Sequence, residues 1–177
     1  MDAYLAVVSK REVRDYTDRP VTGDVLTKIL QAGRATGSSK NTQPWRFIVL
    51  RDAERRMTLA GYLTGRANLE RCTVAVAIVL LSDRLRFDAG RVAQNMMVAA
   101  WAVGVGSCPN SVHPDHVDDA RTLLALPDEA AVASVLTLGY PAAGQPHPRP
   151  KADPVRVLAR IKRLPLEEIV FEERYSG

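Results

Sequence analysis

Three cationic side chains gather within five residues near the start of the chain, in the run Lys10-Arg11-Glu12-Val13-Arg14. Such a group can hold a phosphate, and the planar arginine fork is well suited to it because it donates two parallel hydrogen bonds to anionic oxygens. A solvated charged turn gives the same pattern, as do cations that complement the carboxyl end of a helix. This run alone therefore leaves a phosphate site and an ordinary charged surface both open.

A second group of polar side chains precedes a hydrophobic segment, in the run Ser38-Ser39-Lys40-Asn41-Thr42-Gln43-Pro44-Trp45. Hydroxyls and amides on a loop held by a rigid scaffold can hydrogen-bond a polar planar ring or a ribityl chain. Serine and asparagine also form turns without any ligand. The composition of this loop therefore admits both interpretations.

A third group follows a helical segment, where Gly104 and Gly106 lead into Ser107-Cys108-Pro109. The dinucleotide-binding fingerprint requires a strand before its glycines and a helix after them, whereas here the order is reversed. We therefore expect the glycines to let the chain turn and approach a ligand closely. The preceding Met96 and Met97 are more typical of a hydrophobic core than of a cofactor site.

In order and spacing, these segments resemble the nitroreductase family of flavoproteins. The matching parts are residues 11–16, the block at 38–45, the 88–96 helix with the glycine segment at 104–109, and Leu138-Gly139-Tyr140-Pro141 with the basic stretch at 160–165. The block at 38–45 is the most specific of them. The resemblance covers nearly the whole chain.

The resemblance implies an α+β fold, with a central, mostly antiparallel sheet surrounded by helices in an intertwined homodimer that binds two FMN molecules at its interface. It also implies ping-pong chemistry, in which NAD(P)H reduces the flavin and an electron-poor acceptor such as a nitroaromatic, quinone, enone or flavin oxidises it. The flavin carries the hydride chemistry, so no catalytic side chain is required. A flavin-binding carrier or sensor without turnover is the alternative, and the sequence leaves both open.

The resemblance assigns cofactor contacts residue by residue. The N-terminal cations match the positions that hold the phosphate, ribityl chain and pyrimidine edge, and the C-terminal cations match the phosphate position. The block at 38–45, called the serine loop below, matches the segment that reaches the other subunit's flavin. Asn68 matches an amide that reads the pyrimidine ring, and residues 109–111 match the segment near the reactive N5. The full set is Lys10, Arg11, Arg14, Ser38, Ser39, Asn41, Gln43, Asn68, Pro109, Asn110, Ser111, Lys162 and Arg163.

Glu12 departs from the family pattern, because members often carry a phosphate-donating serine there. A carboxylate beside a phosphate would repel it. We therefore expect Glu12 to point away from the site or to pair with a cation.

Hydrophobic periodicity and turn residues divide the chain into alternating helices and strands, which gives an α/β or α+β class. We expect helices at residues 3–9, 21–36, 53–63, 88–103, 115–126 and 155–163, and strands at 45–50, 74–81 and 131–138. The segment at 74–81 is apolar throughout, which predicts a strand buried on both faces. His113-Pro114-Asp115-His116 is expected to begin a helix rather than to bind a metal.

The helix at 88–103 is apolar around most of its circumference, so it must be covered on most faces. With 177 residues, the chain forms one domain that offers limited cover, and a symmetric partner is the simplest solution. Residues 142–154 are rich in proline and glycine and lack a core of their own. We therefore expect a flavin-binding core at 1–141 and an extended segment of the same domain at 142–177 that packs on the partner subunit.

The composition of the chain argues against several other classes of protein. The net charge of +4 is mild, and the chain lacks the basic and aromatic interleaving of a nucleic-acid-binding protein. Two cysteines make neither a disulfide framework nor a zinc site, which favours a reducing compartment. No apolar run has the length of a membrane span, and the N-terminus lacks the pattern of a secretory signal. We therefore predict a cytoplasmic protein that binds neither membrane nor nucleic acid.

Overall fold

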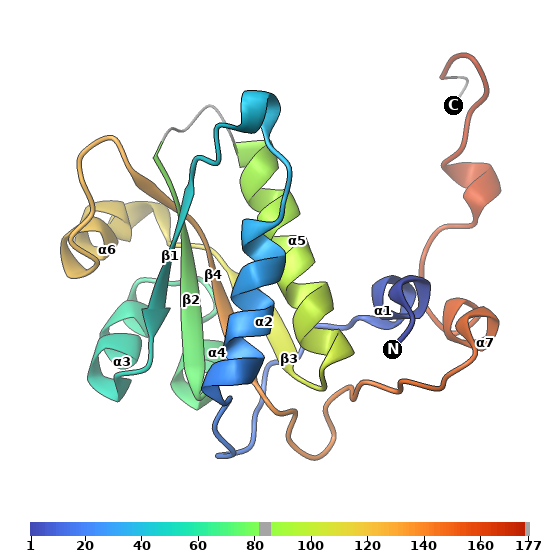
Figure 1. Ribbon diagram of the computed structural model, residues 1–177, viewed down its shortest axis with the longest axis horizontal. Coiled ribbons are helices and arrows are strands. Elements are labelled where there is room, and N and C mark those ends of the chain that lie inside the picture. Colours follow the sequence, from blue (N-terminus) through green and yellow to red (C-terminus); the bar gives the residue numbers. More distant parts are fainter. Residues whose placement is uncertain (82–85, 176–177) are drawn as a thin grey trace.

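The computed structural model describes residues 1–81 and 86–175, and its centre is a four-stranded antiparallel sheet (Figure 1). The strands are β1 (Trp45–Leu50), β2 (Val74–Leu80), β3 (Gly106–Asn110) and β4 (Ala131–Gly139), in the order β1-β2-β4-β3. Each neighbouring pair runs antiparallel. This confirms the predicted α+β class with an antiparallel sheet.

Every residue of β2 is buried, as its composition predicts. Alternate side chains of a strand point to opposite faces of the sheet. Val74, Val76, Ile78 and Leu80 therefore enter one hydrophobic core, while Ala75 and Ala77 enter the other. The two cores explain why an antiparallel strand here shows no polar alternation.

Helices cover both faces of the sheet. On one face α2 (Gly23–Arg34) and α5 (Arg86–Ala102) lie side by side and fill the first core (Figure 1). On the other face the second core takes residues from α3 (Ala53–Gly61), α4 (Arg66–Arg71) and α6 (Val117–Leu123). The sheet is thus enclosed between two helical layers.

The N-terminal helix and the last α-helix meet outside these layers. The N-terminal helix α1 (Ala3–Ser9) packs against α7 (Pro154–Leu158), and an extended segment then leads away from the body (Figure 1). Short 3-10 turns occur at Ser39–Asn41, Pro114–His116 and Leu166–Glu168. In the described parts of the chain, no helix is both long and apolar enough to cross a membrane.

Most predicted elements are confirmed, and the differences have physical reasons. The predicted strand at 45–50 matches β1, and Thr22 is the N-cap residue of α2, although its side chain makes no capping hydrogen bond. The predicted helix at 115–126 is a 3-10 turn that continues into the shorter α6, because the chain turns at Ala125, whose φ is 50°. This 3-10 turn has Pro114 in its first turn, which confirms the helix start predicted there.

Candidate active site

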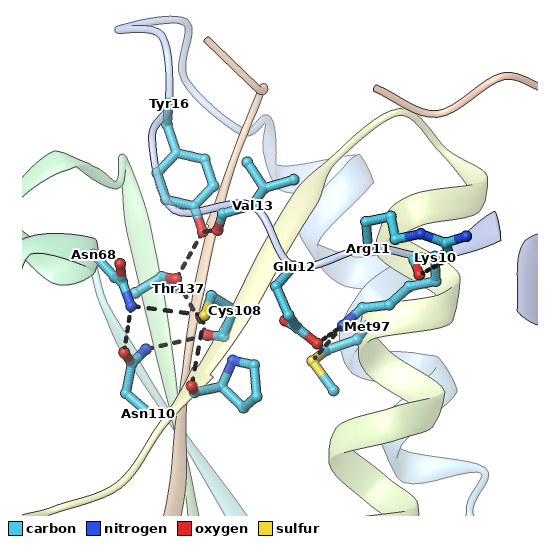
Figure 2. Close-up of polar contacts among 11 residues, drawn as sticks. Lys10, Arg11, Glu12, Val13, Tyr16, Asn68, Met97, Cys108, Asn110 and Thr137 are labelled. Atoms are coloured by element: carbon cyan, nitrogen blue, oxygen red, sulfur yellow. Dashed lines mark hydrogen bonds and ion pairs between the residues drawn. The ribbon is translucent and has the colours of Figure 1, made fainter. Parts of the chain in front are cut away.

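Lys10 and Glu12 form a tight pair beside α5. The Nζ of Lys10 donates to the Oε1 of Glu12 at 2.5 Å and lies 3.4 Å from the Sδ of Met97 (Figure 2). The side chain of Lys10 is only 6% exposed, against 36% for Glu12. The sequence predicted that Glu12 either points away or pairs with a cation, and the second outcome is confirmed.

This pairing reduces what Lys10 can offer to a phosphate, because its charge is already opposed by a carboxylate. The second oxygen of Glu12, Oε2, is buried without a hydrogen-bond partner among the described residues. The carboxylate also lies close to the thiol of Cys108. Burial raises the pKa of that thiol, and Glu12 contributes to the increase.

Arg11 points away from this pair and closes the end of α1. Its Nη1 donates to the carbonyl oxygen of Lys10 at 2.7 Å (Figure 2) and to that of Val8 at 2.9 Å. Burial lowers the pKa of Arg11, and the positive charge of Arg163 lowers it further. The fold therefore places the guanidinium of Arg163, near the other end of the chain, close enough for its charge to act on Arg11.

The other predicted cations are more exposed. Arg14 is exposed, and its backbone N–H donates to the Oε1 of Gln145 at 3.1 Å. This bond ties the basic N-terminal segment to the proline-rich segment that follows β4. Lys162 is exposed, and its carbonyl oxygen accepts a hydrogen bond from the side chain of Arg163.

Asn68 of α4 and Asn110, the last residue of β3, form a buried pair of side-chain amides. The Nδ2 of Asn68 donates to the Oδ1 of Asn110 at 2.8 Å, and the Nδ2 of Asn110 donates to the carbonyl oxygen of Cys108 at 3.1 Å (Figure 2). The same Nδ2 also donates to the carbonyl oxygen of Val135 at 3.1 Å. These hydrogen bonds tie the end of β3 to α4 and to β4. The carbonyl of the following residue, Ser111, accepts from the backbone N–H of Thr64 at 3.0 Å.

The side chain of Tyr16 links the basic segment to the sheet, a role that its sequence position did not predict. Its hydroxyl contacts the carbonyl oxygen of Val13 at 2.5 Å and the Oγ1 of Thr137 at 2.7 Å, deep between the strands. Burial raises its pKa strongly. The neutral hydroxyl thus anchors residues 13–16 to β4.

A pocket of about 390 Å³ opens between α5 and the end of the sheet. It is lined by Ala89, Gly90, Ala93 and Met97 of α5, Pro109 of β3, and residues 131–134 of β4. Residues four apart share one face of a helix. Ala89, Ala93 and Met97 therefore line the pocket in a row that leads directly to the Lys10–Glu12 pair.

The serine loop lies elsewhere. It follows α2 and lies beside the start of α5 (Figure 1). Thr36, before the loop, accepts a hydrogen bond from Asn95 near the middle of α5 at 2.8 Å. The cations lie towards the other end of α5, where Trp101 donates to Ser9 at 3.0 Å. A single chain therefore does not bring Ser38, Ser39, Asn41 and Gln43 to the cations.

The serine loop has an unusual backbone. Lys40, Asn41 and Gln43 have φ values of 50°, 56° and 46°, which non-glycine residues seldom adopt. The backbone N–H of Gln43 donates to the Oγ of Ser38 at 2.9 Å, which closes the loop. Ser39, Asn41 and Gln43 are exposed, so the loop presents its polar groups outwards.

Comparisons with known proteins identify the family. The family model described as the nitroreductase family matches residues 7–77 and 82–140. An NADH dehydrogenase of Thermus thermophilus is 29% identical over 213 residues, covering 97% of this chain and 96% of the relative. An FMN reductase [NAD(P)H] of Bacillus subtilis is 25% identical, covering 96% of this chain and 73% of the relative.

The solved structure of the NADPH:FMN oxidoreductase of Vibrio harveyi, complexed with NAD⁺, superposes with a TM-score of 0.82. It is 25% identical, and the match covers 99% of this chain and 79% of that one. The chain belongs to the nitroreductase family.

Proposed function

We propose that this protein is an NAD(P)H-dependent FMN oxidoreductase. Its family membership supports the activity, and relatives in that family are named FMN reductase and NADPH:FMN oxidoreductase. The observation that carries the assignment to this chain is that Arg11 and Arg163, two cations from opposite ends of the sequence, lie close enough for the charge of Arg163 to lower the pKa of Arg11. The neighbouring Lys10 contacts Met97, which lines the pocket along α5.

The residues present suit a flavin monophosphate. Arg11 and Arg163 bind the phosphate, because paired guanidinium groups form strong charge-assisted hydrogen bonds with its oxygens. The pocket along α5 takes the ring, with Met97 and Pro109 as its walls. Bound FMN supplies the hydride chemistry, accepting a hydride from NAD(P)H and passing electrons to an acceptor.

The protein contributes orientation rather than a reacting side chain. The amide pair of Asn68 and Asn110 fixes the end of β3, so Pro109 to Ser111 keep their position beside the ring. The pocket remains open to an electron-poor acceptor such as a nitroaromatic, quinone, enone or flavin. Ping-pong turnover would have NAD(P)H and the acceptor use this pocket one after the other.

The active form is a homodimer. Gln94, Asn95, Val98 and Ala99 of α5 line a shallow groove of about 490 Å³ with α1, and Val7 of α1 is 55% exposed. In the C-terminal segment the apolar side chains of Leu164, Leu166, Ile169 and Val170 are all more than half exposed. A partner subunit would cover both surfaces, and its serine loop would complete the flavin site.

The test begins with the purified protein, which is expected to be yellow. Anaerobic addition of NADH or NADPH should bleach the flavin, and a nitroaromatic or quinone should restore its colour. A flavin that stays oxidised under NAD(P)H favours the carrier alternative, and a chain that binds no FMN overturns the proposal. Sedimentation should give about twice the 19.4 kDa chain mass, and a flavin-loaded monomer would contradict the shared site.

A further inference from the structure

A second, larger pocket lies at the other end of the same face of α5. Its volume is about 870 Å³, and it is an open hollow lined by residues of α1, of the proline-rich segment after β4 and of α7. Trp101, one helical turn beyond Met97, forms part of its wall. The flavin pocket, the Lys10–Glu12 pair and this basic pocket therefore follow one another along a single helix face.

The charge of this basic pocket is strongly one-sided. Five cationic side chains line it against the single carboxylate of Asp153, namely Arg11, Arg149, Lys151, Arg156 and Arg160. Asp153 lies 3.7 Å from Arg156 and also accepts from the backbone N–H of Val155, so it serves its own helix. Across residues 1–81 and 86–175, the structure gives Arg149, Lys151 and Arg160 no carboxylate partner.

The backbone holds two of these cations in place. Prolines alternate with other residues in Pro146-His147-Pro148-Arg149-Pro150-Lys151. Each proline fixes its own φ and restricts the residue before it. Arg149 and Lys151 thus project from a stiff segment, which lowers the entropy lost when they bind a ligand.

These cations exceed what one flavin phosphate needs. Arg11, beside Arg163, is assigned above to that phosphate, and it also lines the basic pocket. Arg149, Lys151, Arg156 and Arg160 extend the positive charge beyond this point. A pocket lined by one sign of charge concentrates ligands of the opposite sign.

We propose that the basic pocket binds the adenosine diphosphate portion of a dinucleotide. The cations would hold the two phosphates, and the apolar surfaces of Pro150 and Val157 would pack against the adenine. The volume lies within the range of about 300–1,000 Å³ of small-molecule sites. The position beside the flavin phosphate rests on the proposed function, but the binding of adenosine diphosphate can be tested without it.

Two different ligands could supply the adenosine diphosphate group, because both FAD and NAD(P)H carry it. Binding of FAD in place of FMN would continue from the flavin phosphate into the basic pocket. NAD(P)H would enter it with its adenosine end while its nicotinamide lies over the flavin ring. The experiment therefore measures the shared group first and separates the two sources afterwards.

The first arm measures ADP binding to the purified full-length protein by calorimetry. Arg149→Ser with Lys151→Ser should weaken ADP by about tenfold or more, because charge-assisted hydrogen bonds are lost. The control replaces Arg51 and Arg55, exposed cations at the start of α3, with serine and should leave ADP binding unchanged. Equal ADP affinity in the wild type and the Arg149/Lys151 variant overturns the proposal, as does inorganic phosphate that binds as tightly as ADP.

The second arm identifies the source. If FAD is the ligand, the Arg149/Lys151 variant loses affinity for FAD but keeps its affinity for FMN. If NAD(P)H is the ligand, the KM for NAD(P)H rises while that for reduced nicotinamide mononucleotide, which lacks the adenosine portion, does not change. Loss of FMN binding in the wild type would overturn the proposed function, whereas wild-type FMN binding without ADP binding would overturn only this inference.

Discussion

Replacing Glu12 with glutamine tests how the Lys10–Glu12 pair sets flavin affinity. The substitution keeps the shape of the side chain and removes its charge. In the wild type the ammonium of Lys10 is 2.5 Å from a carboxylate, and a hydrogen bond of this kind contributes about 1.5–3 kcal/mol. Lys10 must give up much of that interaction before it can attract a phosphate.

We therefore expect Glu12→Gln to tighten FMN binding by about 1.4 kcal/mol, which is about tenfold. Riboflavin, which has no phosphate, should bind as before. Without flavin the variant should lose about 1–2 kcal/mol of stability, because Lys10 is buried and keeps only weaker contacts with the new amide and with Met97. This is less than the cost of breaking a fully buried pair, since Glu12 is partly exposed.

Titration of flavin fluorescence with FMN and with riboflavin measures the affinities, and urea unfolding measures the stability. Asp118→Asn is the matched control, because it removes a carboxylate paired with Arg121 at the exposed surface of α6. The double variant Lys10→Met with Glu12→Gln should lose the gain in FMN affinity. Unchanged FMN binding in Glu12→Gln, an equal gain for riboflavin, or a gain that survives without Lys10 would refute this reasoning.

Three further predictions concern the site and its support. Arg11→Ala and Arg163→Ala should each weaken FMN at least about tenfold while leaving riboflavin unchanged, measured by the same titrations. Gly106→Ala should destabilise the fold by about 1–3 kcal/mol in urea, because the new Cβ would lie 2.7–2.8 Å from the side chain of Val13. Burial raises the pKa of Cys72 to about 11, so stability should fall by about 1 kcal/mol per pH unit between pH 9 and 11, where only the unfolded chain releases this proton.

Each of these predictions has its own control. Arg51→Ala should leave both flavins unaffected, and wild-type FMN affinity in both site variants would reject the phosphate assignment. Gly61→Ala should not destabilise the fold, because no atom lies within 4 Å of the new Cβ. Cys72→Ala should flatten the alkaline loss of stability, and an unchanged pH profile would show that another group causes it.

Local sequence determines those elements whose patterns need no distant partner. The uninterrupted apolar run of β2 requires cover on both faces wherever it lies. Likewise the helix at 88–103 is predicted from its own residues, which are apolar around most of its circumference, and its observed form, α5, extends from Arg86 to Ala102. The basic, serine-loop and glycine segments were also recognisable, because each consists of neighbouring residues.

The strand β3 could not be predicted from its own residues. Gly106-Ser107-Cys108-Pro109-Asn110 contains no β-branched or aromatic side chain. It forms a strand because β4 offers an edge with which residues 106–110 pair in register. The short helix α4 was missed for a similar reason, since it depends on packing beneath the sheet.

The convergence of distant side chains depends on tertiary structure alone. Arg11 approaches Arg163 only because α7 returns to pack against α1. The amides of Asn68 and Asn110 meet only because the end of β3 passes α4. Sequence could name these groups as candidates from their chemistry. Their charge and hydrogen-bonding groups have no direction until the backbone places them, so the fold decided which of them lie together.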